Sequence, residues 1–212
     1  MKITGLRKNS SNDRISVEVD GTFAVSVSLE ALMEEGVNRG AELTKEQLKR
    51  LQNRSSVEHA SAEAVRLLKY GRRTEADLLD RLQEKGYDRL TSDTVVQKLK
   101  QLGLIDDREY CHSFFLSHRD MNGWGPDKIR HALRKKGLPE QLIEEAAGEC
   151  YDRDTAVEQA VRAGYKKLRS LQRKTDNKQE LRIKLNRFLY SRGFDAACCQ
   201  TAISEILLNQ ED

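Results

Sequence analysis

Residues 78–87, with the sequence LLDRLQEKGY, contain a pattern that recurs as IRHALRKKGL at 129–138 and as LNRFLYSRGF at 185–194. Each copy has an apolar residue, a second one four positions later, a glycine four positions after that, and an apolar residue directly after the glycine. The spacing of four places both apolar side chains on one helical face, and the glycine is typical of a left-handed helix end. The glycines follow at intervals of 51 and 56 residues, which suits three short helices per copy. The sequence therefore predicts tandem repeats of a three-helix module.

The predicted fold class is mainly α. Modules of this kind pack chiefly on their neighbours, so we expect an elongated, curved array with an extended binding surface. We assign residues 44–105 to a long linking helix and repeat 1, residues 106–150 to repeat 2, and residues 151–212 to repeat 3. Residues 1–43 are assigned to a small β-hairpin extension and a short helix.

The N-terminal extension carries two runs of alternating apolar and polar residues, one on each side of Asp20-Gly21. This alternation predicts two antiparallel strands. A two-residue loop would send the two apolar rows to opposite faces, whereas a three-residue loop that includes Val19 pairs Val17 with Phe23. Because burial of one face fixes the register of a strand, we favour the three-residue loop.

Helix starts are marked along the chain by capping residues. Thr44 and Gln47 form the pattern of a capping box, and no glycine or proline follows until Gly71, so one long helix is expected. Asp106 stands where a helix N-terminus favours a carboxylate, and Gly125-Pro126 places proline at a first helical position. Such carboxylates are interpreted as caps and not as an acid–base pair.

Composition narrows the function classes. Charged residues make up 33% of the chain and aromatic residues 6%, which is typical of a surface-rich helical protein. No run approaches the roughly 18 apolar residues of a membrane span, and no signal peptide opens the sequence. The four cysteines lack metal-ligand spacing, and we expect Cys111 to be a small core residue. With no catalytic motif found, we expect a cytoplasmic monomer that is not an enzyme and uses no cofactor, metal or membrane.

Positive charge is unevenly distributed. The net charge is only +3, yet residues 161–192 hold eleven lysines and arginines against two acidic residues. An excess so one-sided indicates a polyanionic partner, although a solvated helix face is the alternative.

The three-helix unit invites comparison with helix-turn-helix proteins that read DNA bases. Gln97 and Lys98 would suit a base-reading helix in repeat 1, but the corresponding helix after Pro139 is acidic, and residues 196–208 nearly lack positive charge. Because two of three candidate helices fail, we expect the cations to touch backbone phosphate or an acidic protein surface without reading sequence.

These stretches also resemble a known family. The run AVRLLKYGRRTEADLL at 64–79 looks like the first-module signature of RecX, the bacterial regulator of the RecA recombinase, and GLIDDREY at 103–110 continues the likeness. The second-module pattern matches at 123–137, GWGPDKIRHALRKKG, and the third matches mainly through the recurrent pattern at 185–194. Cys111 stands where the family pattern has alanine, an exchange of one small residue for another.

The resemblance implies a non-enzymatic regulator that binds the RecA–single-stranded DNA filament in its helical groove. Such a protein contacts neighbouring protomers and modulates recombinase, ATPase and coprotease activities, and we expect inhibition. Its partners are the RecA filament and single-stranded DNA, contacted directly or through the filament. The first alternative is a general DNA-binding or architectural protein that uses a basic face, and the second is a helical adaptor for another partner.

The family motifs consist of caps, turn glycines and core leucines, so contact residues are chosen by charge alone. The candidates are Arg66, Lys69, Arg72 and Arg73 in repeat 1, and Lys166, Lys167, Arg169, Arg173, Lys174, Arg182 and Arg187 in repeat 3.

Overall fold

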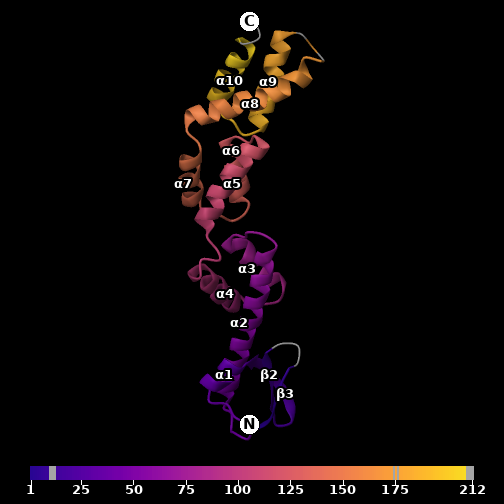
Figure 1. Ribbon diagram of the computed structural model, residues 1–212, viewed down its shortest axis with the longest axis vertical. Helices are drawn as coiled ribbons and strands as arrows, with labels where there is room; N and C mark the ends of the chain where they lie inside the picture. The colour runs from indigo at the N-terminus through magenta and orange to yellow at the C-terminus, as the bar shows by residue number, and fades with distance from the viewer. Residues whose placement is uncertain (10–12, 174, 176, 209–212) are drawn as a thin grey trace. The chain divides into compact units, whose positions relative to one another are not determined.

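A computed structural model describes residues 1–9, 13–173, 175 and 177–208 of the chain. The described residues form three strands and ten helices: β1 (Ile3–Lys8), β2 (Arg14–Val19), β3 (Thr22–Ser28), α1 (Leu29–Glu34), α2 (Lys45–Lys69), α3 (Glu75–Glu84), α4 (Arg89–Gln101), α5 (Asp107–Asn122), α6 (Pro126–Arg134), α7 (Glu140–Cys150), α8 (Arg153–Leu171), α9 (Lys178–Ser191) and α10 (Ala196–Leu208) (Figure 1). They belong to two compact units, Met1–Ile105 and Asp106–Asp212. The predicted fold class, mainly α with helical repeats after a small β element, is confirmed.

The recurrent pattern ends one helix in each of three bundles. Bundle 1 consists of the C-terminal half of α2 with α3 and α4, bundle 2 of α5, α6 and α7, and bundle 3 of α8, α9 and α10. The six spaced apolar residues are fully buried: Leu78, Leu82, Ile129, Leu133, Leu185 and Leu189. Each bundle therefore has its own apolar core, built around the residues that the pattern predicts.

The glycines of the pattern close these helices as expected. Gly86, Gly137 and Gly193 have φ of 90°, 76° and 89°. In each turn, the apolar residue after the glycine donates its backbone N–H to the carbonyl of the second spaced apolar residue, as Phe194 does to Leu189 at 3.3 Å. This is the bond of a Schellman motif, which satisfies a carbonyl that the helix leaves open.

The N-terminal sheet is antiparallel with order β1-β2-β3, and its predicted hairpin register is wrong. Asp20 and Gly21 both have positive φ (48° and 85°), as a two-residue type I′ turn requires, and Glu18 pairs with Phe23. The register then shifts so that Val17 pairs with Val25, because one extra residue of β3 forms a bulge. The bulge achieves the one-sided burial that motivated the longer loop, and Phe23 is left 65% exposed.

Helix α2 joins this sheet to bundle 1 without a break. Its N-terminus has the predicted capping box, with Thr44 accepting from the backbone N–H of Gln47. Arg14 of β2 forms an ion pair with Glu58 of α2 at 2.8 Å, and Glu58 also accepts from the Ser28 hydroxyl at 2.7 Å. These half-buried polar contacts hold the sheet against α2.

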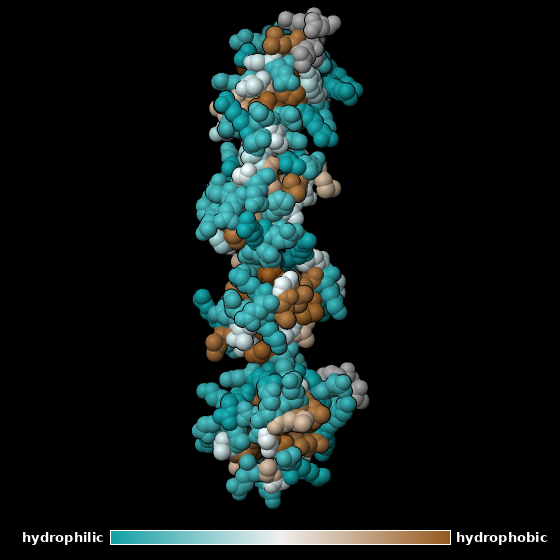
Figure 2. All heavy atoms as spheres, turned by 60° about the vertical axis from the view of Figure 1, so that its left-hand side comes forward, coloured by the Kyte–Doolittle hydropathy of each residue, from teal (hydrophilic) through white to brown (hydrophobic). Residues whose placement is uncertain are grey.

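The surface drawn in Figure 2 is mainly hydrophilic, as the high content of charged residues predicts. On the face drawn in Figure 2, hydrophilic side chains cover most of each bundle and hydrophobic side chains gather in small patches. Among the described residues, no helix combines the length and apolar character that crossing a bilayer demands.

Candidate functional site

Bundles 2 and 3 meet through two glycine turns that are in direct backbone contact. The Gly125 N–H donates to the Arg192 carbonyl at 2.8 Å, and the Asp127 N–H donates to the Gly193 carbonyl at 3.1 Å. A Cβ on Gly125 would lie 2.4 Å from the Gly193 oxygen, and a Cβ on Gly193 would lie 2.4 Å from the Lys128 nitrogen. Only glycine fits at either position, so these turns fix where the end of α5 lies against α8 and α9.

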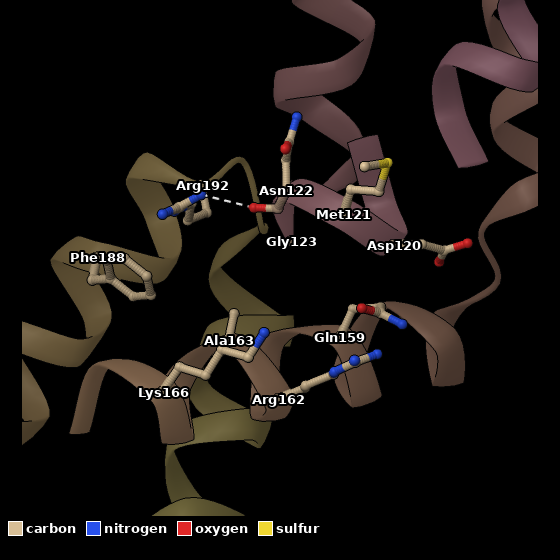
Figure 3. Close-up of a pocket in the computed structure, with 10 residues that line it drawn as sticks. All are labelled: Asp120, Met121, Asn122, Gly123, Gln159, Arg162, Ala163, Lys166, Phe188 and Arg192. Atoms are coloured by element: carbon tan, nitrogen blue, oxygen red, sulfur yellow. Dashed lines mark hydrogen bonds between the residues drawn. The ribbon is translucent and has the colours of Figure 1, made fainter. Parts of the chain in front are cut away.

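This contact creates a cleft between the C-terminal end of α5, one face of α8 and the end of α9 (Figure 3). The lining residues are Asp120, Met121, Asn122, Gly123, Gln159, Arg162, Ala163, Lys166, Phe188 and Arg192. Three of the ten are cations and one is a carboxylate, so the cleft is a place where an anion can be held.

Arg192 is fixed in the wall of the cleft. Its guanidinium donates to the Asn122 carbonyl at 2.8 Å and lies 5.1 Å from the centre of the Phe188 ring (Figure 3). A guanidinium has five N–H donors, and the contact with an aromatic ring holds it without using them. Arg192 therefore keeps donors for a further partner.

The carboxylate at the rim, Asp120, is already engaged. Arg119 donates to it at 2.7 Å and 3.3 Å. This hydrogen-bonded guanidinium lowers the pKa of Asp120, and the nearby charge of Arg162 lowers it further. Asp120 is thus an ion-paired anion whose charge Arg119 balances, which leaves the other three cations in excess.

The cations of α8 continue beyond the cleft along one face of the helix. Arg162, Lys166 and Arg169 follow at spacings of four and three residues, which places them on the same side. All three are exposed, and none forms an ion pair with any described residue. We call these three residues the α8 stripe.

The other predicted contact residues of repeat 3 do not join this stripe. Lys167 points to the Phe188 ring, 5.6 Å from its centre, whereas Arg182 and Arg187 line hollows between α9 and α10. Arg173 is exposed in the turn after α8, and Lys174 lies outside the described residues. The basic residues that the charge count groups together therefore lie on several separate surfaces of bundle 3.

The hollows between α9 and α10 differ in chemistry from the cleft. Arg182 lines both hollows, which also contain Ile183 and Leu208, with exposed fractions of 48% and 65%. Basic, neutral polar and apolar side chains line these hollows together, whereas the α8 stripe consists of cations only.

In bundle 1, the predicted contact residues are partly neutralised. Arg66 donates to Glu63 at 2.7 Å and 3.0 Å, and Arg73 donates to Asp77 at 3.2 Å. Arg66, followed by Lys85, lowers the pKa of Glu63 to about 2. Lys69 and Arg72 are exposed near the end of α2.

Charge counting missed two residues of the cleft as contact candidates. Arg162 belongs to the basic segment 161–192 but not to the charge-based candidates, although its spacing from Lys166 and Arg169 marks a common helix face. Arg192 follows Phe188 by four residues, a spacing that predicts their contact, but its hydrogen bond to the Asn122 carbonyl joins residues 70 positions apart and has no sequence signal.

Cysteines and capping carboxylates behave as structural residues. Cys111 is fully buried, as expected, and burial raises the pKa of its thiol to about 11. Asp106 accepts from the Glu109 backbone at 2.9 Å, which confirms its capping role. No group of three potential metal ligands comes together among the described residues.

Three comparisons relate the chain to known proteins. Family models described as the first, second and third three-helix domains of RecX match residues 60–99, 106–146 and 154–203. A protein from Clostridium botulinum (strain Eklund 17B / Type B), named Regulatory protein RecX, is 30% identical over 97% of this chain and 96% of its own length. A protein of the same name from Lacticaseibacillus paracasei is 30% identical, covering 97% of this chain and 84% of its own length.

Solved structures show the same fold. A crystal structure of a regulatory protein RecX superposes with a TM-score of 0.78, at 24% identity, over 94% of this chain and 97% of that one. A crystal structure of RecX from Lactobacillus salivarius gives a TM-score of 0.66, at 24% identity, over 72% of this chain and 97% of that one.

Proposed function

Because the chain belongs to the RecX family of regulatory proteins, which implies regulation of RecA, we propose that it binds the RecA filament on single-stranded DNA and inhibits it. In this proposal it occupies the helical groove as a cytoplasmic monomer and lowers recombinase, ATPase and coprotease activities. The observation that carries the proposal is the match of all three helical domains to the family, in order along the chain.

The architecture supports binding to a polymer. Each bundle has its own core, and the chain links three of them, so successive bundles can engage successive positions of a repeating partner. Linked contacts raise total affinity strongly even when each one is weak, provided that they engage together. A ligand that bridges several positions of the filament in this way restrains them relative to one another, and we expect this restraint to lower the filament's activities.

The electrostatics of bundle 3 support a polyanionic partner. The α8 stripe and Arg192 present positive charge that no described carboxylate neutralises, apart from the influence of Asp120 on Arg162. In the filament, both DNA phosphates and acidic protein surfaces offer complementary charge. We assign the main electrostatic contact to this region, ahead of the partly paired cations of bundle 1.

The test follows RecA-catalysed ATP hydrolysis and strand exchange on single-stranded DNA while the chain is added. We expect both activities to fall as the chain reaches saturation, together with co-sedimentation of the chain with the filament. Unchanged ATP hydrolysis and strand exchange at saturating protein would reject the proposal.

A second candidate, a general DNA-binding or architectural protein, is favoured by the same unpaired cations. It predicts tight binding to bare duplex and single-stranded DNA with a steep salt dependence. The two candidates are separated by comparing affinity for bare DNA with affinity for the assembled filament, and our proposal expects the filament to be bound more tightly.

A further inference from the structure

The two hollows between α9 and α10 are continuous, and we call them together the α9–α10 groove. The first has a volume of about 370 Å³ and is lined by Lys178 and Arg182 together with Leu208. The second has a volume of about 320 Å³ and is lined by Arg182 and Arg187 together with Ile203. Because Arg182 lines both hollows, the groove runs along the pair of helices from Lys178 to Arg187.

The groove lies on a side of bundle 3 that α8 does not cover. Leu181, Leu185 and Leu189 of α9 turn into the core that α9 and α10 share with α8 (Figure 1). None of these leucines lines the groove, and the groove shares no lining residue with the cleft. From Lys178 to Arg187, α9 advances about 14 Å at about 1.5 Å per residue, so the groove is long enough to seat about nine residues of another helix.

The groove carries positive charge. Arg182 and Arg187 are exposed, and neither forms an ion pair with a described residue. Glu180, the acidic residue of α9, is bound to other partners, because its carboxylate pairs with Lys184 at 2.5 Å and accepts from the Thr175 hydroxyl at 2.6 Å. No carboxylate of the described residues lines either hollow. The groove therefore favours an anionic partner.

The groove also presents apolar side chains, and these are aliphatic. Ile183 and Leu208 are 48% and 65% exposed, whereas Ile203, which also lines the groove, is buried. The described residues that line it include no aromatic ring, although proteins that grip a single strand of nucleic acid use aromatic rings on which bases stack. Aliphatic side chains flanked by cations fit instead a helix that has apolar residues on one face and carboxylates beside them.

We propose that the α9–α10 groove binds an acidic, amphipathic helical segment of a second protein. The apolar face of that segment packs on Ile183 and Leu208, and its carboxylates pair with Arg182 and Arg187. The inference goes beyond the proposed function, because the groove and the cleft are separate surfaces. Bundle 3 can therefore hold this segment while the cleft and the α8 stripe face the filament.

The experiment measures the fluorescence anisotropy of a labelled synthetic peptide that is titrated with the full chain at low ionic strength. The peptide spans about three helical turns, with leucines at spacings of three and four residues and glutamates elsewhere. We expect saturable binding with a dissociation constant below about 100 μM. A control peptide of the same composition, with its leucines spread around the helix, should bind at least about tenfold more weakly because it has no apolar face.

Two matched pairs of variants locate the binding site. Arg182→Gln should weaken peptide binding about fivefold, whereas Arg153→Gln, which removes an exposed arginine of α8 outside the groove, should leave it unchanged. Leu208→Ala should also weaken binding about fivefold, whereas Leu90→Ala, which removes a leucine that is 75% exposed in bundle 1, should not. Circular dichroism of each variant shows that the helices are retained.

Four results would overturn the inference. They are the absence of saturable binding by the wild-type chain up to about 100 μM, equal affinity for the two peptides, equal losses within the paired variants, and displacement of the peptide by oligothymidylate as readily as by unlabelled peptide. The last result would assign the groove to nucleic acid.

A second copy of this chain is the other protein that the groove could hold. Sedimentation velocity of the wild-type chain tests this, and a dimer that Arg182→Gln abolishes would assign the groove to self-association and overturn the proposal. Inhibition of RecA by the wild-type chain is measured without the peptide, so the proposed function can stand while this inference fails, and the reverse.

Discussion

Bundles 1 and 3 are built on the same recurrent pattern, yet they present their positive charge differently. In bundle 1, Arg66 is bonded to Glu63 and Arg73 to Asp77, whereas in bundle 3 Arg162 and the rest of the α8 stripe form no ion pair with any described residue. A cation beside its own carboxylate has lost much of its field at a distance, and an unpaired one has not. The number of basic residues therefore overstates bundle 1 as a binding surface.

The glycine of the recurrent pattern has different surroundings in bundles 1 and 3. Gly86 and Gly193 have nearly the same positive φ, but a Cβ on Gly86 would meet nothing within 4 Å. A Cβ on Gly193 would collide with Lys128 of α6. One glycine serves only as a helix cap, and the other also permits contact between two bundles.

The largest expected effect tests whether the separate cores of bundles 1 and 3 are built in the same way. Leu82→Ala and Leu189→Ala each remove a fully buried side chain at the same place in the pattern. Each should lower the free energy of unfolding of its own unit by roughly 2 to 5 kcal/mol. Urea denaturation monitored by circular dichroism measures this, and a neutral result for either variant would contradict the equivalence of the two cores.

A second pair of variants tests the difference between the glycines. Gly86→Ala should cost about 1 to 2 kcal/mol, because alanine is strained in the left-handed conformation. Gly193→Ala adds a backbone collision and should cost at least about 3 kcal/mol. Equal unfolding midpoints for the two variants would show that the contact between bundles 2 and 3 is not tight.

The smallest effect concerns pH and the paired cations of bundle 1. The folded pKa of Glu63 is about 2, below the value of about 4.3 for an unfolded glutamate. Its ionised form therefore stabilises the fold fully above about pH 5, and that stabilisation is lost as pH falls towards 2. The variant Glu63→Gln should show a shallower loss of stability between pH 5 and 2.

The control for this pH series is Glu84→Gln. Glu84 is exposed in the same bundle and forms no ion pair with a described residue. Stability measured by urea midpoints should follow the wild-type pH profile in this variant. If both variants follow that profile, Glu63 does not supply the acid-sensitive stabilisation.

The sequence predicts most of the fold because its signals are local. The spaced leucines, the glycine ends and the capping box at Thr44 each depend on neighbours within one or two helical turns. The predicted hairpin register is wrong, because a bulge after Phe23 lets a two-residue turn keep Val17 and Val25 on one buried face, and alternation alone does not encode a bulge.

The candidate site was predictable only in part. The charge excess located bundle 3, and the helical spacing of Arg162, Lys166 and Arg169 could have selected the stripe. The cleft itself depends on Gly125 meeting Gly193 across 68 residues, and no periodicity reports such a contact. The ion pairs Arg66–Glu63 and Arg73–Asp77 join residues three and four positions apart, so the sequence could have indicated them, whereas Lys85 reaches Glu63 only after α2 and α3 have packed.

The most direct measurement compares inhibition of RecA-catalysed, DNA-dependent ATP hydrolysis by two charge-matched variants. One is Arg162→Gln, Lys166→Gln in bundle 3, and the other is Arg66→Gln, Arg73→Gln in bundle 1. The account predicts a loss of inhibition, by about tenfold in the concentration required, for the bundle 3 variant and near wild-type inhibition for the other. The opposite order, or the same loss in both, would contradict the claim that unpaired cations of bundle 3 carry the contact.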